Sequence, residues 1–149
     1  MVTELSPDVA ARGIVFAVGL LSLFAAHQIG DHVLQTDRQA TAKAGRGRAG
    51  LRAMVGHLVA YHLTAAALLV GTGAVLGLPL STRGLLAALG FSAITHGLLD
   101  RRWPVRAILR ATGAAEFAES TAPVCGMYVA DQALHQLALL ISALLLAAL

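Results

Sequence analysis

Four long apolar runs constrain the fold of this chain more than any other feature of its sequence. They cover about residues 13–36, 51–76, 84–101 and 124–148. Hydrophobic residues make up 57% of the chain and charged residues only 13%, which is far from the composition of a water-soluble domain. A helix needs about 20 apolar residues to cross a hydrocarbon core about 30 Å thick. The sequence therefore predicts an all-α, polytopic membrane protein in which residues 1–149 form a single four-helix transmembrane domain.

Local signals refine the ends of the predicted helices. Ser6 and Pro7 form a helix start, as N-cap and first helical residue, so the first helix is expected over residues 7–36. The other three long helices are expected over residues 51–76, 84–101 and 124–148. A short amphipathic helix is expected over about residues 104–112, beside Trp103. Its pattern predicts that it lies in the membrane interface, in contact with lipid.

Basic residues gather in two loops and predict the orientation. The first loop carries Arg38, Lys43, Arg46, Arg48 and Arg52, and the second carries Arg101, Arg102, Arg106 and Arg110. By the positive-inside rule both loops are cytoplasmic, which places both termini outside. The net charge of +3 is explained by this orientation and by contact with lipid headgroups, so no nucleic-acid partner is expected.

Ionisable residues recur inside the apolar runs at a spacing of one helical turn. The pattern HxxxD occurs at the ends of the first and third runs, and its reverse occurs near the start of the fourth. The residues concerned are His27 and Asp31, His96 and Asp100, and Asp131 and His135, with His57 and Tyr61 in the second run. Residues four apart share a helix face. At about 1.5 Å per residue the His and Asp residues all reach a common depth in the cytoplasmic half, which predicts one shared site.

The chain also resembles two copies of one helical hairpin. In each copy the first helix carries HxxxD at its C-terminal end, a basic loop follows, and the second helix has polar residues in its first turns. Both copies have the same orientation. The sequence therefore predicts parallel repeats related by an axis along the membrane normal.

Imidazole and carboxylate side chains together form a ligand set for a divalent transition metal. Zinc is favoured, with iron or manganese as alternatives. The predicted ligands are His27, Asp31, His57, His96, Asp100, Asp131 and His135. This set allows either two ions or one ion with outer carboxylates that orient the imidazole rings. The alternative without metal is a network of His–Asp pairs that locks the helices together or conducts protons.

Three neighbouring polar residues are not expected to be ligands at this site. Helical phase turns His32 and His62 away from it, as packing or interfacial histidines. Gln35 continues the face of His27 and Asp31 by one turn and is expected to form hydrogen bonds at the membrane surface.

Two classes of function remain open. In the first, the protein is a metal-dependent hydrolase for a lipid-linked or anionic substrate, with Asp31, Asp100 and Tyr61 as candidate catalytic residues. In the second it is a non-enzymatic membrane module, either a metal or proton conduit or a metal sensor that binds a partner protein. Apolar outer halves of the helices count against a permanent pore. The sequence leaves a homo-oligomer open.

The motifs resemble those of a bacterial membrane family known as domain of unknown function 3307. The opening string is His27-x3-Asp31-x2-Leu34-Gln35-Thr36, followed by Ala40 and Lys43; then come His57, His96-x3-Asp100-Arg101 and Asp131-Gln132-x2-His135. The resemblance covers about residues 20–145 and departs at Gln39, where the family tends to have Met. It implies a multi-pass protein of the bacterial cytoplasmic membrane. It brings no established activity, and a looser similarity to membrane-bound metal-dependent hydrolases is an analogy only.

Overall fold

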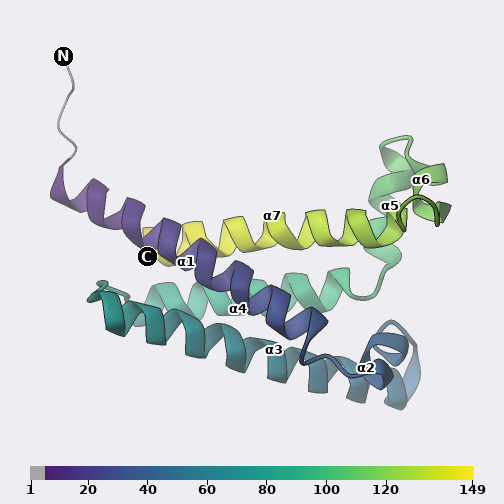
Figure 1. The fold of residues 1–149 in the computed structure, drawn as a ribbon, viewed down its shortest axis with the longest axis horizontal. Helices are drawn as coiled ribbons and strands as arrows, with labels where there is room; N and C mark the ends of the chain where they lie inside the picture. The colour runs from purple at the N-terminus through teal and green to yellow at the C-terminus, as the bar shows by residue number, and fades with distance from the viewer. Residues whose placement is uncertain (1–5) are drawn as a thin grey trace.

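The computed structural model describes residues 6–149, and its regular elements are helices (Figure 1). The long ones are α1 (Pro7–His32), α3 (Gly47–Leu76), α4 (Thr82–Leu99) and α7 (Gly126–Ala148); the short ones are α2 (Asp37–Ala42), α5 (Trp103–Ala111) and α6 (Ala115–Glu119). The predicted all-α class is confirmed. Residues 1–5, which include the N-terminal end that the topology prediction places outside, lie outside the described residues.

Three of the long helices are long and apolar enough to cross a membrane. They are α1, α3 and α7, with mean hydropathies of 2.1, 1.7 and 1.6 over their most apolar windows. The fourth long helix, α4, has 18 residues, which correspond to about 27 Å of helix. Arg83 in its first turn and His96 in its last turn lower its hydropathy. The structure therefore shows three candidate membrane spans, while the predicted fourth has only the minimum length.

The four long helices run side by side and leave their connections at two opposite ends (Figure 1). The short helices α2, α5 and α6 gather at one end, and the C-terminus and the turn between α3 and α4 lie at the other. Helix α1 packs against α3 and α7, and α4 packs against α7. Glycine allows close approach between two of these pairs: a Cβ on Gly30 would lie 2.6 Å from Tyr61 Cδ2, and one on Gly19 would lie 2.7 Å from Leu146 Cδ2.

The end of α1 differs from the prediction. Its start is as expected, since the Ser6 side chain accepts a hydrogen bond from the Val9 amide at 3.4 Å. The helix ends at His32 rather than at residue 36, because Thr36 caps a new helix, α2, through a capping box with Gln39. The chain therefore turns after α1 and packs α2 against α3. This turn carries part of the first basic loop back toward the helix ends.

The other boundaries shift by a few residues. Helix α3 begins at Gly47 rather than 51, α4 covers Thr82–Leu99 rather than 84–101, and α7 begins at Gly126 rather than 124. The short helix α5 occurs close to its predicted range, with Val105 buried and Trp103 63% exposed. The loop before α7 contains a further helix, α6, which was not predicted.

Candidate metal centre

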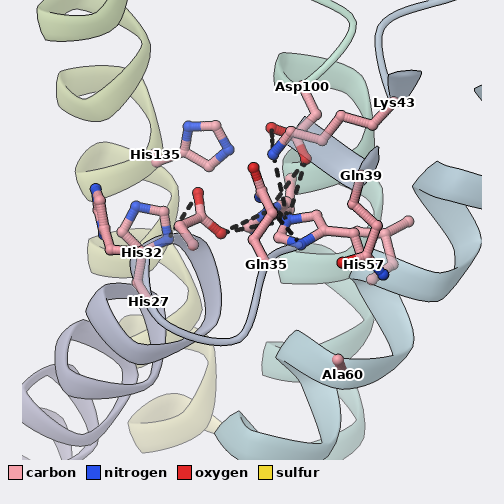
Figure 2. Close-up of polar contacts among 12 residues, drawn as sticks. His27, His32, Gln35, Gln39, Lys43, His57, Ala60, Asp100 and His135 are labelled. Carbon is pink, nitrogen blue, oxygen red and sulfur yellow. Dashed lines mark hydrogen bonds and ion pairs between the residues drawn. The ribbon is translucent and has the colours of Figure 1, made fainter. Parts of the chain in front are cut away.

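The ends of α1 and α4 and the beginnings of α3 and α7 bring their polar side chains together at the end of the bundle that carries α2, α5 and α6 (Figure 2). Five of these side chains are buried: His27, His57, His96, Asp100 and His135. The Asp31 side chain is 6% exposed and that of Asp131 is 19% exposed. The predicted convergence of all seven residues at one level is therefore present in the structure.

Two imidazole nitrogens and two carboxylate oxygens face a common point. His57 Nε2 lies 3.3 Å from both Asp31 Oδ1 and Asp100 Oδ2. His96 Nε2 lies 3.3 Å from the same two oxygens, and the two nitrogens are 2.9 Å apart. A regular tetrahedron with edges of about 3.3 Å has its centre about 2.0 Å from each corner, and zinc binds nitrogen and oxygen ligands at about this distance.

The hydrogen bonding of these atoms tests whether the residues fit a metal ion. Among the described residues, Asp31 Oδ1 and Asp100 Oδ2 are buried without a hydrogen-bond partner. Each faces two imidazole nitrogens, and those nitrogens also face each other. Buried acceptor atoms held this close are costly unless protons or a cation lie between them. The donor set and its spacing fit a divalent ion.

Gln35 contacts the His57 imidazole. Its side-chain Nε2 atom lies 3.2 Å from His57 Nδ1 and 3.3 Å from His57 Nε2, so it is nearly equidistant from the two ring nitrogens. Gln35 therefore lies beside a candidate ligand, while its place at the membrane surface stays a prediction.

Lys43 is a member of the cluster that the sequence did not reveal. It is 7% exposed, and its Nζ atom lies 2.7 Å from Asp100 Oδ1 and 3.4 Å from His57 Nε2 (Figure 2). The prediction counted it among the basic residues that orient the loop. Helix α2 ends at Ala42 and turns Lys43 inward. The sequence feature that could have indicated a role for Lys43 in the site was its position after Ala40 in the motif that resembles the family's.

A second layer of polar side chains lies beside the four converging atoms. His135 Nδ1–H donates to the Asp131 carbonyl at 2.9 Å, so its Nε2 carries a lone pair, and within the described residues that buried atom has no hydrogen-bond partner. The His27 ring stacks on that of His135 with centroids 5.1 Å apart, and its Nε2 lies 3.2 Å from Gln132 Oε1. Asp100, Asp131 and His135 could also hold an ion by the spacing of their ligand atoms.

The remaining polar residues surround the cluster without joining the four-atom set. The Tyr61 ring is fully buried, 4.2 Å from that of His96 between centroids, and its hydroxyl has no hydrogen-bond partner among the described residues. His62 Nδ1–H donates to the Leu58 carbonyl, and its Nε2 accepts from Ser92 at 3.3 Å. Both ring nitrogens of His62 are thus engaged away from the site.

A cavity of about 420 Å³ opens beside the cluster. Asp31, Asp100 and Asp131 contribute to its lining, and so does Lys43. Its outer wall comes from α5, α6 and the segment before α7, including Arg102, Arg106, Glu119, Ser120 and Thr121. His32 and Tyr128, joined by a hydrogen bond of 2.7 Å, also line it. The cavity therefore borders the carboxylate residues of the candidate centre, and Asp131 is the most exposed of the three.

The fold and the site define a class of protein: a helical protein with membrane-length spans and a buried His/Asp cluster at one end of the bundle. The chain belongs to the family DUF3307, described as a protein of unknown function, whose model matches residues 20–149. Comparison with curated proteins and comparison with solved structures gave no match.

Proposed function

We propose that this protein is an integral membrane metalloprotein that binds one divalent ion and acts as a metal-dependent hydrolase on an anionic or lipid-linked substrate. The ligands are His57, His96, Asp31 and Asp100. The convergence of their four atoms, with separations of 2.9 and 3.3 Å, is the observation that carries this proposal. The other predicted ligands, His27, Asp131 and His135, form the surrounding layer.

Charge balance favours one ion over two. Asp31, Asp100 and Asp131 bring three negative charges, and Lys43 brings one positive charge. One divalent ion makes the cluster neutral, whereas a second would leave two uncompensated positive charges. Uncompensated charge is costly in the interior of a membrane protein.

The ligand set favours zinc among the divalent ions. Two imidazole nitrogens and two carboxylate oxygens within 4.8 Å of one another match its preference for mixed nitrogen and oxygen ligands. Magnesium and calcium prefer shells of oxygen ligands alone. Iron and manganese remain the alternatives among the transition metals.

The cavity is the basis for the catalytic part of the proposal. A bound zinc ion supplies Lewis acidity that polarises a substrate oxygen or a water molecule. Asp131 lines the cavity, is partly exposed and stands outside the four-atom set, so it is the carboxylate available to accept a proton. Asp31 and Asp100, predicted as catalytic, act as ligands in this scheme. Tyr61 does not line the cavity, and its role here is to pack against His96.

A structural or sensory ion is the second candidate, and one observation favours it. Four protein atoms could by number fill the tetrahedral shell that is typical of structural zinc sites. A conduit is less well supported, because Leu23, Leu69 and Ala143 fill the core between the cluster and the opposite end.

The same proposal includes the membrane topology. All four long helices cross the cytoplasmic membrane, α1 with α3 and α4 with α7 as two parallel hairpins, and the metal centre lies on the cytoplasmic side. The packing of these two pairs supports the hairpins. The gathering of α2, α5 and α6, with most of the basic residues, at one end of the bundle supports the orientation (Figure 1).

Elemental analysis of protein purified in detergent without chelator tests the metal. We expect about one equivalent of a transition metal in the parent and a large loss in His96→Ala. His62→Ala is the matched control, because both nitrogens of that ring are engaged elsewhere, and it should retain the metal. A metal-free parent would contradict the proposal and support a His–Asp network.

Turnover of phosphate, carboxylate and sulfate esters tests the hydrolase. We expect activity that chelator abolishes. Asp131→Asn should lose most of the activity while it keeps the metal, because Asp131 is not a ligand in this scheme. Full metal content without turnover of any ester would support the structural or sensory ion instead.

A further inference from the structure

We infer that the cavity contains a binding subsite for a phosphate group, formed by Arg102 and Arg106, and that phosphate binds there only when the metal centre is loaded. This inference rests on the proposed function and names the chemical class of its substrate. It adds to the metal centre a second group of residues, from the start of α5 and the residue before it.

Both arginines line the same cavity, Arg102 as the residue directly before α5 and Arg106 from its first turns. The guanidinium group binds phosphate oxygens through paired N–H donors. Ser120 and Thr121 on the outer wall add hydroxyl donors to the same space. The cavity thus combines a carboxylate-rich inner side with a cationic outer side.

Existing contacts leave both guanidinium groups available. Arg106 Nε lies 3.8 Å from Glu119 Oε1, and both side chains are largely exposed, at 47% and 68%. Such a pair is weak, and a phosphate group can replace its carboxylate. Arg102 Nη2 donates to the Ala40 carbonyl at 3.4 Å, and Ala40 also lines the cavity. The Arg102 guanidinium therefore already extends across this space.

The backbone of Arg102 adds an independent observation. Its φ angle is +65°, and it is the one non-glycine residue with positive φ in the described part of the chain. Glycine would adopt this conformation without strain, whereas arginine does so at a cost. Strained backbone conformations of this kind are concentrated at binding sites and active sites.

The charges of the cavity couple phosphate binding to the ion. Asp31, Asp100, Asp131 and Glu119 carry four negative charges, against three positive charges on Lys43, Arg102 and Arg106. The lining is therefore net negative and repels an anion. Binding of a divalent ion changes the net charge of the lining to positive. The cavity therefore attracts phosphate only when the ion is bound. By linkage, phosphate must strengthen metal binding by the same factor, for which 5- to 150-fold is a typical range.

Calorimetric titration of inorganic phosphate into the detergent-solubilised protein tests the inference, with zinc or with chelator. The zinc-loaded protein should bind phosphate at least about 5-fold more tightly than the chelated protein. Arg102→Gln and Arg106→Gln should each weaken binding about tenfold or more, with zinc content unchanged. Arg110→Gln is the matched control on the same helix, because Arg110 is exposed and does not line the cavity.

Short-chain phosphatidic acid in place of inorganic phosphate identifies the source of the phosphate group. Tighter binding of the lipid indicates a lipid headgroup, and equal binding indicates a soluble phosphate compound. Two results would overturn this inference while leaving the metal centre intact, provided that the zinc content is normal. One is a phosphate affinity that does not depend on zinc, and the other is the same phosphate affinity in the Arg102, Arg106 and Arg110 variants. Absence of zinc from the parent would instead overturn the metal centre on which it rests.

Discussion

Replacing Asp100 by Asn in chelator tests the electrostatics of the cluster without any contribution from the ion. Lys43 Nζ and Asp100 Oδ1 are 2.7 Å apart, and their side chains are only 9% and 3% exposed. Two unit charges at that distance attract by about 6 kcal/mol at an effective dielectric constant of about 20. Desolvation of both groups offsets much of this attraction, but removal of one partner leaves the other charge buried. We therefore expect Asp100→Asn to lower the free energy of unfolding by about 3–5 kcal/mol.

The exposed pair on the same end of the molecule is the control. Glu119→Gln removes a carboxylate 3.8 Å from Arg106 at largely exposed positions, and should cost less than about 1 kcal/mol. The double variant Lys43→Met/Asp100→Asn should recover much of the loss, because the buried Lys43 charge is then no longer left without its carboxylate partner. Denaturant unfolding in detergent, followed by circular dichroism, measures all of these values. Equal losses for Asp100→Asn and Glu119→Gln, or additive losses in the double variant, would refute the reasoning.

Two further predictions concern packing and topology. Gly30→Ala places a methyl group 2.6 Å from a ring carbon on α3 and should cost about 1–3 kcal/mol, whereas Gly13→Ala, with no atom within 4 Å, should not destabilise; equal effects in thermal unfolding would argue against the close packing of α1 and α3. In a background without the native cysteine, a cysteine at Arg48 should be protected from an impermeant thiol reagent in intact cells and one at Asp8 should react. The reverse labelling pattern would invert the orientation and place the metal centre on the outer side.

The spacing of ionisable residues predicted the centre of the site because helical geometry is local. HxxxD in two helices and DxxxH in a third fix which side chains share a face, and the lengths of the apolar runs fix their depth. The structure brings Asp31, His57, His96 and Asp100 within ligand distance of one another, as this argument requires. Helical phase also predicted that His62 turns away from the site. His62 is close to the cluster, but its ring nitrogens are hydrogen-bonded to Leu58 and Ser92.

Features that depend on the path of the connections were not predicted. Lys43 enters the cluster only because the chain stops α1 at His32 and starts α2 after Thr36. From the sequence, a lysine among arginines in a glycine-rich loop is typical of a solvated, orienting charge. The outer wall of the cavity was missed for the same reason. This wall is formed by the packing of α5 and α6 against α7. Periodicity in the sequence does not predict such packing between helices.

X-ray absorption spectroscopy of the zinc-loaded protein tests the central claim most directly, since it counts and identifies the ligand atoms. The proposed centre predicts one zinc ion with two imidazole nitrogens and two carboxylate oxygens at about 2.0 Å. His96→Ala should remove one of the two imidazoles from the spectrum of any zinc that remains. A six-coordinate shell of oxygen atoms alone, unchanged in His96→Ala, would contradict the assignment of Asp31, His57, His96 and Asp100 as the ligands.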